Sequence, residues 1–252
     1  MLSAFLDINI FHFFLVFSRL GAALMLMPGM SGKFVPANNR LFISLAVSAA
    51  VTPVMSPMLP PMPAELFQQI IMIAAEVTIG ILLGSLAEIV LASLHVAGTL
   101  VSFQGGFANA LIIDPITQQQ GSVVTGLFDL AAITLIFTTD LHHLFIEAIG
   151  DSYYVFAPGQ FPDVGDMNKV IVEQVGASFL LGAKLASPFV VFTVVLYSAM
   201  GVLSKLAPQI QVFFVMMPLQ LLASLALLAL ALPGMMYWFM RHFEGVFIPL
   251  LR

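Results

Sequence analysis

Apolar stretches long enough to cross a lipid bilayer recur along the whole of this sequence, and they constrain the fold more than any other feature. A membrane-spanning helix needs about 20 predominantly apolar residues. Of the 252 residues, 60% are hydrophobic and only 8% are charged, whereas a soluble domain carries about 25% charged residues. The sequence therefore predicts an all-α integral membrane protein. Because the apolar stretches leave no room for a separate soluble domain, we expect one membrane domain over residues 1–252.

Proline, glycine and polar clusters divide the apolar sequence into expected helices. These helices cover roughly 10–29, 40–52, 64–103, 122–138, 170–203 and 210–240. The 64–103 stretch contains no proline, and as one helix it would be roughly 60 Å long, about twice the thickness of the hydrocarbon core. It is therefore expected to form two helices, a hairpin, or one helix that leaves the bilayer. We expect about six spans, with five to seven as the range, and the longest solvated segment at 138–169.

Ionisable residues interrupt these apolar stretches at six positions, which are Arg19, Glu76, Glu88, Asp129, Glu173 and Lys184. A charge near the centre of a bilayer costs several kcal/mol unless it is paired or hydrated, so such a side chain faces protein or water. One interpretation is an ion or proton path. The other is a set of buried pairs or contacts to partner subunits, and this one is favoured because the charges are scattered and share no repeated motif.

Small residues at four-residue spacing occur in several of the expected helices. The sets are Gly80 with Gly84, Ser44 with Ser48, and Ser178 with Gly182 and Ala186. In lipid, small residues at this spacing let two helix backbones approach closely. The pattern therefore predicts tightly packed helix neighbours.

The residues that could support catalysis or metal binding are poorly arranged in the sequence. The segment "DLHHLFIE" gathers Asp140, His142, His143 and Glu147, but adjacent histidines point to different faces of a helix, and the spacing is not the His-Glu-x-x-His pattern of zinc enzymes. Ser178 is followed by one histidine alone, His242, near the end of the chain. The sequence thus predicts no catalytic residue, no cofactor and no metal site, and without a basic run it does not predict nucleic-acid binding.

A polar, glycine-rich segment, "GGFANALIIDPITQQQGS" at 105–122, lies between two apolar helices. Irregular backbone at membrane depth survives only where protein or a water-filled cavity satisfies its polar groups. The residues alone allow either a loop that lies inside a channel or an ordinary surface turn.

Four segments in their order resemble one known family. They are "SRLGAALMLMPGMSGKFVPANNR", "EVTIGILLGSL", "GTLVSFQGGFANALIIDP" and "SPFVVFTVVLYSAMGVLSKLAPQIQVFFVMMPLQL". Together, from Arg19 to about Pro233, they resemble the FliR family of flagellar export-gate subunits, which has SctT as its injectisome relative. The most specific pieces are the Gly-x-x-x-Gly helix, the loop with Asp114 and Pro115, and "APQ" at 207–209.

The resemblance implies a fold similar to a fusion of two partner subunits, FliP and FliQ, within a closed helical assembly. That assembly is the entry gate for unfolded export substrate proteins in the bacterial inner membrane, at the base of the flagellum. The implied partners are FliP-like and FliQ-like membrane subunits, FlhB-like and FlhA-like export components, the substrates and the lipid membrane. In the family much of the complex lies above the bilayer plane, so charges inside apolar stretches would meet protein.

The resemblance also implies roles for individual residues. The loop at 105–122 would plug the central channel, through Gly105, Gly106, Phe107, Ala108, Asn109, Ala110, Leu111, Ile112, Ile113, Asp114, Pro115, Gln118, Gln119 and Gln120. Helix packing and assembly would rest on Gly80, Gly84, Gly182, Pro188, Pro208, Gln209 and Pro218. The buried charges would be Arg19, Glu76, Glu88, Asp129, Lys184 and Lys205. Lys205 stands where many relatives carry arginine, and lysine is a weaker bidentate partner.

Two other functions remain as alternatives at this point. One is an injectisome export-gate subunit of the same family. The other is a stand-alone secondary transporter with an ion site built from Glu76, Asp129 and Lys184. A transporter of that kind is expected to show an internal repeat with broken helices in corresponding halves, and the sequence shows no such repeat.

Overall fold

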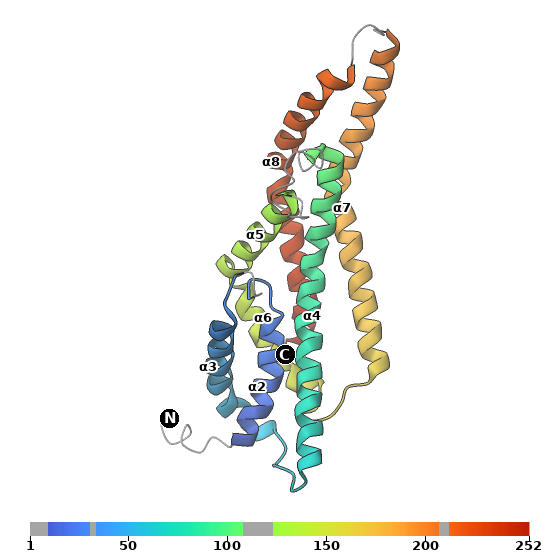
Figure 1. The fold of residues 1–252 in the computed structure, drawn as a ribbon. Coiled ribbons are helices and arrows are strands. Elements are labelled where there is room, and N and C mark those ends of the chain that lie inside the picture. Colours follow the sequence, from blue (N-terminus) through green and yellow to red (C-terminus); the bar gives the residue numbers. More distant parts are fainter. Residues whose placement is uncertain (1–9, 31–33, 108–122, 207–211, 252) are drawn as a thin grey trace. The chain divides into compact units, whose positions relative to one another are not determined.

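Helices make up most of the part of the chain that the structure describes. The structure is a computed structural model, and it describes residues 10–251 apart from 31–33, 108–122 and 207–211. The α-helices in these residues are α2 (Ile10–Met25), α3 (Ala37–Met55), α4 (Leu66–Gly105), α5 (Val123–Thr138), α6 (Leu141–Val155), α7 (Val164–Leu206) and α8 (Val212–Phe247) (Figure 1). Short 3₁₀ turns, η1 (Ser56–Met58) and η3 (Ile248–Leu250), follow α3 and α8. The predicted all-α fold is confirmed, with no strand among the described residues.

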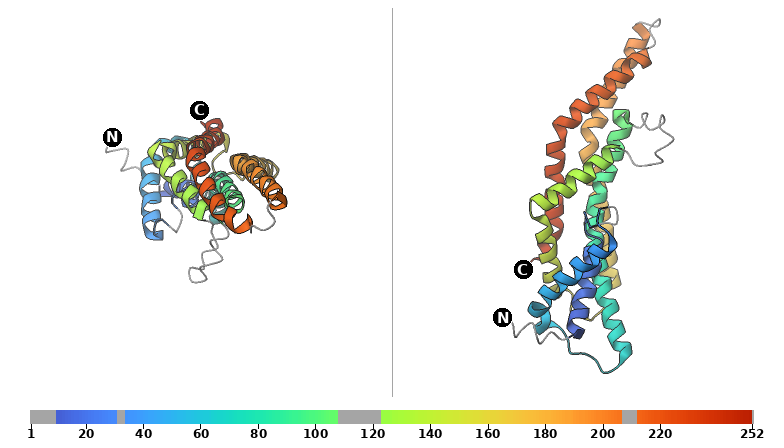
Figure 2. Two further views of the ribbon diagram at one scale, coloured as in Figure 1. Left: turned by 90° about the horizontal axis from the view of Figure 1, so that it is seen from above. Right: turned by 60° about the vertical axis from the view of Figure 1, so that its left-hand side comes forward.

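Among the described residues, four helical segments are long and apolar enough to cross a membrane, fewer than the six expected. They are Ala37–Met58, Leu66–Gly105, Val164–Leu206 and Met216–Leu250, and a fifth span results if α5 and α6 together form one broken span. The two expected spans missing from these four are 10–29, where α2 has only 16 residues, and 122–138, where α5 also has only 16 residues and counts as a span only together with α6. The expected 64–103 stretch is a single helix, α4, of 40 residues, uninterrupted in Figure 1 and in the two further views of Figure 2. Since its length of roughly 60 Å exceeds the hydrocarbon thickness, a spanning α4 extends beyond the bilayer.

A further difference concerns the segment expected to be solvated at 138–169, because it contains α6. The helix buries Leu141, Phe145, Ala148, Ile149 and Ser152, which recur at the three- and four-residue spacing of one helix face. The acidic and polar residues between these positions, together with the nearby prolines, concealed this periodicity in the sequence.

The chain divides into two compact units, and each is described by itself. The first unit comprises 1–90, 136–175 and 242–252, and the second comprises 91–135 and 176–241. The helices α4, α5, α7 and α8 contribute residues to both units. The expectation of one membrane domain over residues 1–252 stays a prediction.

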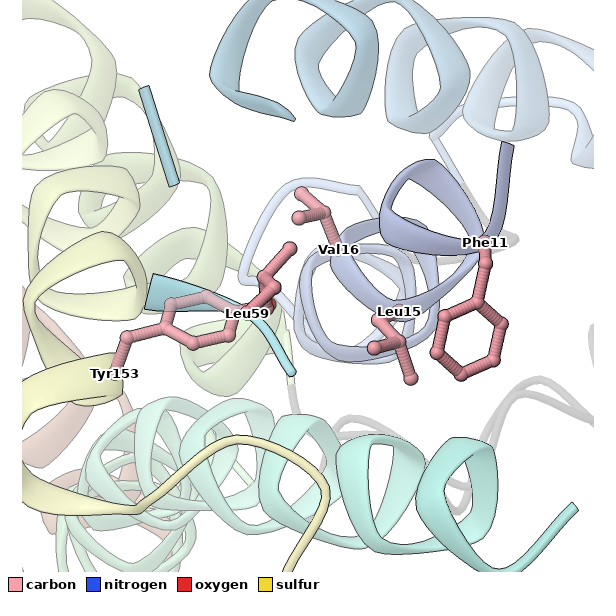
Figure 3. Close-up of a cluster of buried hydrophobic side chains, with 5 residues drawn as sticks. All are labelled: Phe11, Leu15, Val16, Leu59 and Tyr153. Atoms are coloured by element: carbon pink, nitrogen blue, oxygen red, sulfur yellow. The ribbon is translucent and has the colours of Figure 1, made fainter. Parts of the chain in front are cut away.

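In the first unit, an apolar cluster connects α2 with the segment that follows α3 and with α6. Its buried members are Phe11, Leu15, Val16, Leu59 and Tyr153, and Figure 3 shows Leu59 beside the ring of Tyr153. Phe11 and Leu15 are four residues apart and so share one face of α2.

A polar contact supplements this cluster at the start of α2. The ring nitrogens of His12 lie 2.8 Å from Oγ of Ser56 and 3.1 Å from the carbonyl oxygen of Pro60. The position of the proline-rich connection relative to α2 is thereby fixed.

Candidate functional site

The first part of the candidate site is the end of α4, where the 105–122 segment begins. The last carbonyl groups of a helix have no partner within the helix. Here the carbonyl oxygen of Gln104 accepts hydrogen bonds from Oγ1 of Thr193 and from Nε2 of Gln220, each at 2.9 Å. Thr193 belongs to α7 and Gln220 to α8. Side chains of two other helices of the second unit therefore hold the end of α4.

The two glycines at this end fit tightly. Gly106 has a φ of +77°, in the left-handed region that glycine adopts without steric cost. A Cβ atom on Gly105 would lie 3.3 Å from the Cβ of Ser224, and one on Gly106 would lie 3.4 Å from Nε2 of Gln220. Ser224 and Gln220 are both buried. Substitution of either glycine would therefore disturb the place where the segment leaves the helix.

The predicted plug can be compared with the structure only at its first three residues. Gly105 is the last residue of α4, so the helix extends two residues beyond its expected end at 103. Gly106 is a buried turn residue and Phe107 is partly buried. The other predicted plug residues, Ala108 to Gln120, lie outside the described residues.

A second polar contact of this unit joins α4 to α5. Nε2 of His95 lies 2.9 and 3.0 Å from the two carboxylate oxygens of Asp129. The helices are close nearby, since a Cβ atom on Gly98 would lie 2.6 Å from Oγ1 of Thr125. His95 was missed in the sequence because it lies 34 residues from Asp129 and no spacing rule connects the two.

The first unit contains a fully buried ion pair between α2 and α4. Nε of Arg19 donates to Oε2 of Glu76 at 2.6 Å, and Nη2 donates to Oε1 at 3.2 Å. Both side chains are 0% exposed. This two-point contact matches the planar guanidinium to the planar carboxylate, which is the strongest form of charge-assisted hydrogen bonding between side chains.

Further contacts connect the ion pair to α6 and to the chain after it. Arg19 also donates to Oγ of Ser152 at 3.1 Å and to the carbonyl oxygen of Phe156 at 3.3 Å. Oε1 of Glu76 accepts from the backbone N–H of Gly159 at 2.8 Å. The cost of removing both charges from water is offset only by such a complete set of partners. The pair therefore fixes α2, α4, α6 and the α6–α7 connection to one another.

An aromatic ring completes the surroundings of the arginine. The guanidinium carbon of Arg19 lies 3.7 Å from the centre of the Tyr153 ring, within the range of a cation–π interaction. The same ring belongs to the apolar cluster of the first unit. The ion pair and the apolar cluster are thus continuous.

Comparison with known proteins decides the family. The family described as "Bacterial export proteins, family 1" matches residues 10–246. The chain belongs to this family. It is 36% identical to the flagellar biosynthetic protein FliR of Caulobacter vibrioides over 91% of this chain and 92% of that protein. It is 29% identical to FliR of Bacillus subtilis, over 86% of this chain and 84% of that protein. The Yop proteins translocation protein T of Yersinia pestis is 28% identical, over 64% of this chain and 63% of that protein.

Membership in the export family confirms the resemblance found in the sequence and gives a context for the predicted charges. Arg19 and Glu76 are buried as expected, and Asp129 is partly buried with its side chain 24% exposed. Glu88, Lys184 and Lys205 are exposed, as is Glu173. Glu88, Lys184 and Lys205 are therefore not covered by the described residues of this chain, and their burial in the assembly stays a prediction.

The ion site of the transporter alternative fits the contacts of its carboxylates poorly. Glu76 is neutralised by Arg19, and Asp129 lies against His95. A carboxylate that already has a close cationic or histidine partner is poorly suited to binding a transported ion in addition. These contacts favour the interpretation of the charges as structural pairs.

The predicted packing glycines of this export protein lie at close helix crossings. A Cβ atom on Gly84 would lie 2.7 Å from the Cβ of Leu26 in the segment after α2, and one on Gly80 would meet the carbonyl oxygen of Arg19. A Cβ atom on Gly182 of α7 would lie 2.6 Å from the carbonyl oxygen of Ser93 in α4.

The predicted packing prolines are less informative. Pro188 lies inside α7, where it is partly buried, and Pro218 lies inside α8, where it is exposed. Pro208 and Gln209 lie outside the described residues. The assembly roles of all four stay predictions.

The two adjacent histidines at the start of α6 differ from their expected arrangement. The rings of His142 and His143 lie with their centres only 4.0 Å apart, although they were expected to point to different faces. Both histidines lie in the first turn of the helix, directly after Asp140. Helix periodicity alone does not predict that the two rings lie so close to each other.

Proposed function

We propose that this chain is a non-catalytic subunit of the flagellar type III protein export gate. The observation that carries the proposal is its similarity to flagellar biosynthetic protein FliR over nine-tenths of both chains. FliP-like and FliQ-like membrane subunits form the channel with it, and FlhB-like and FlhA-like components act beside them. Unfolded flagellar proteins cross the bacterial inner membrane through this channel. The several apolar helices support a membrane location.

In this proposal the 105–122 segment plugs the channel. The carbonyl oxygen of Gln104, directly before the segment, accepts hydrogen bonds from Thr193 and Gln220, so the segment starts from a fixed point. A plug must be anchored at its base and yet able to leave the channel when a substrate passes. Glycines at the start of the segment give the backbone the conformations that such a movement needs.

Deleting residues 107–118 is expected to make the membrane leaky to ions while the subunit still assembles with its partners. The reason is that the deletion removes the proposed plug and leaves the contacts of Gln104 in place. The measurement is single-channel conductance of the purified complex in planar bilayers. A control variant, Gly176→Ala, lies outside the plug at a position with open space around it and should remain closed. A deletion variant that conducts no more than wild type contradicts the plug.

Association with different partners is the test of the gate itself. We expect native mass spectrometry of the tagged chain, gently extracted from its own cells, to recover it with several copies of two other small membrane proteins. Recovery alone or as a homo-oligomer would instead favour the stand-alone transporter.

The injectisome alternative is favoured less, because the Yersinia match covers 64% of the chain and the Caulobacter match 91%. Restoration of motility in a strain that lacks its own FliR distinguishes the two. If an injectisome homologue restores motility in this strain to the same extent as this chain, the flagellar assignment is wrong.

A further inference from the structure

Three side chains at the break between α5 and α6 present ligand atoms to one another. They are Asp140, His142 and His143, and one ligand atom from each lies within 4.8 Å of the others. Nδ1 of His143 is 3.3 Å from Oδ1 of Asp140. Two ligands bound at about 2.1 Å to a tetrahedral zinc ion are about 3.4 Å apart. The carboxylate and the imidazole are therefore already spaced as two ligands of one ion.

The backbone of Asp140 holds its carboxylate on this side. Asp140 is the residue before the first turn of α6, a position where aspartate ordinarily bonds to the backbone N–H groups of the helix. Here its side chain makes no such bond, and its φ of +61° is the only positive value among the described residues other than glycine. The carboxylate lies toward His143 instead.

The second histidine is positioned by the end of α5. Nδ1 of His142 lies 3.4 Å from the carbonyl oxygen of Ile136, and its ring stacks on Phe137 with 5.0 Å between centres. Histidines that bind metals ordinarily donate their other ring N–H to such a carbonyl group. With the proton on Nδ1, the lone pair of Nε2 is available to a metal.

We propose that Asp140, His142 and His143 bind a divalent transition-metal ion of the zinc type. Two imidazoles and one carboxylate are ligands that Zn²⁺, Co²⁺ and Ni²⁺ accept. The remaining coordination positions are filled by water, since Asp140 and His143 are both more than two-thirds exposed. The bound ion joins the first turn of α6 to the last turn of α5 through His142, and it stiffens the break between the two helices. This proposal does not depend on the proposed function.

The test is a metal titration of the complete chain together with the subunits that copurify with it, carrying an affinity tag without histidine. After treatment with a chelator, Co²⁺ is added and its visible absorption is followed, and Zn²⁺ is then added to displace it. We expect one Co²⁺ per chain with a spectrum of low-coordinate cobalt. His143→Ala and His142→Ala should each weaken binding tenfold or more, and Asp140→Asn should weaken it as well.

The matched control is His95→Ala, which removes a histidine that also lies beside a carboxylate and should leave the titration unchanged. The unsubstituted protein supplies a second measurement that does not depend on the folding of any variant. Zn²⁺ should protect His142 and His143, and not His95, from diethyl pyrocarbonate in peptide mass spectra. Absence of a one-to-one Co²⁺ complex, or equal protection of all three histidines, overturns the proposal.

Discussion

Replacing Arg19 by leucine is expected to destabilise the detergent-solubilised chain by about 3–5 kcal/mol, because it leaves the carboxylate of Glu76 charged and buried without its partner. The loss is large beside the roughly 5–15 kcal/mol by which folded proteins are stable. The substitution also removes the donors to Ser152 and Phe156. The measurement is the free energy of unfolding in a denaturant titration, with the yield of folded chain from gel filtration as a second readout.

The double variant Arg19→Leu with Glu76→Leu is the informative control for this prediction. It removes both charges, so no uncompensated charge remains, and it should be more stable than Arg19→Leu alone. Full recovery of the wild-type stability is not expected, since the N–H of Gly159 loses its acceptor. If the double variant is less stable than either single variant, the two charges do not act as a pair. Lys184→Leu, at an exposed position, should change the stability of the chain little.

Placing leucine at both Gly80 and Gly84 is expected to abolish recovery of the complex with its partners. Both glycines lie where α4 approaches α2 and the segment after it so closely that even a Cβ atom meets neighbouring atoms, including the backbone carbonyl group of Arg19. Side chains of this size hold the two segments apart and shift Arg19 away from Glu76. The measurement is the amount of partner subunit that copurifies with the variant.

Single alanine substitutions at a crowded glycine and at an open one are expected to change the free energy of unfolding in opposite directions. Gly80→Ala should lower stability by about 1–3 kcal/mol through overpacking. Gly176→Ala should raise it by up to about 1 kcal/mol, because alanine favours the helix and Gly176 has open space around it within the chain. The measurement is the change in the free energy of unfolding of the solubilised chain for each substitution. Equal effects of the two substitutions would show that crowding at Gly80 is unimportant.

Much of the fold could be predicted because membrane segments have few choices. Backbone polar groups in lipid must be satisfied internally, so apolar stretches of sufficient length form helices. The two glycines of the Gly-x-x-x-Gly spacing, Gly80 and Gly84, both lie against α2 or the segment after it, and their role in assembly stays a prediction. The length of α4 was left open because no residue within 64–103 marks either a break or its absence.

The partners of the charged residues could not be predicted in the same way. Arg19 and Glu76 are 57 residues apart, and which charges meet depends on tertiary packing that no local pattern records. Lys184 and Glu88 lie in apolar stretches, where a charge faces protein or water, and the family resemblance implied that they meet protein. An apolar neighbourhood shows only that the helix avoids water, and it does not show which chain covers that face.

The distance along the chain between Arg19 and Glu76 also has a consequence for biosynthesis. At about 5–20 residues per second, the ribosome adds the 57 residues that separate them in roughly 3–11 seconds, and during this time Glu76 is not yet available to the arginine. The helix α2 has only 16 residues, and a central arginine costs about 2.5–3.5 kcal/mol on the scale of membrane insertion. Pairing of Arg19 with its carboxylate therefore waits for the emergence of α4, and the order of synthesis becomes part of how this subunit is built.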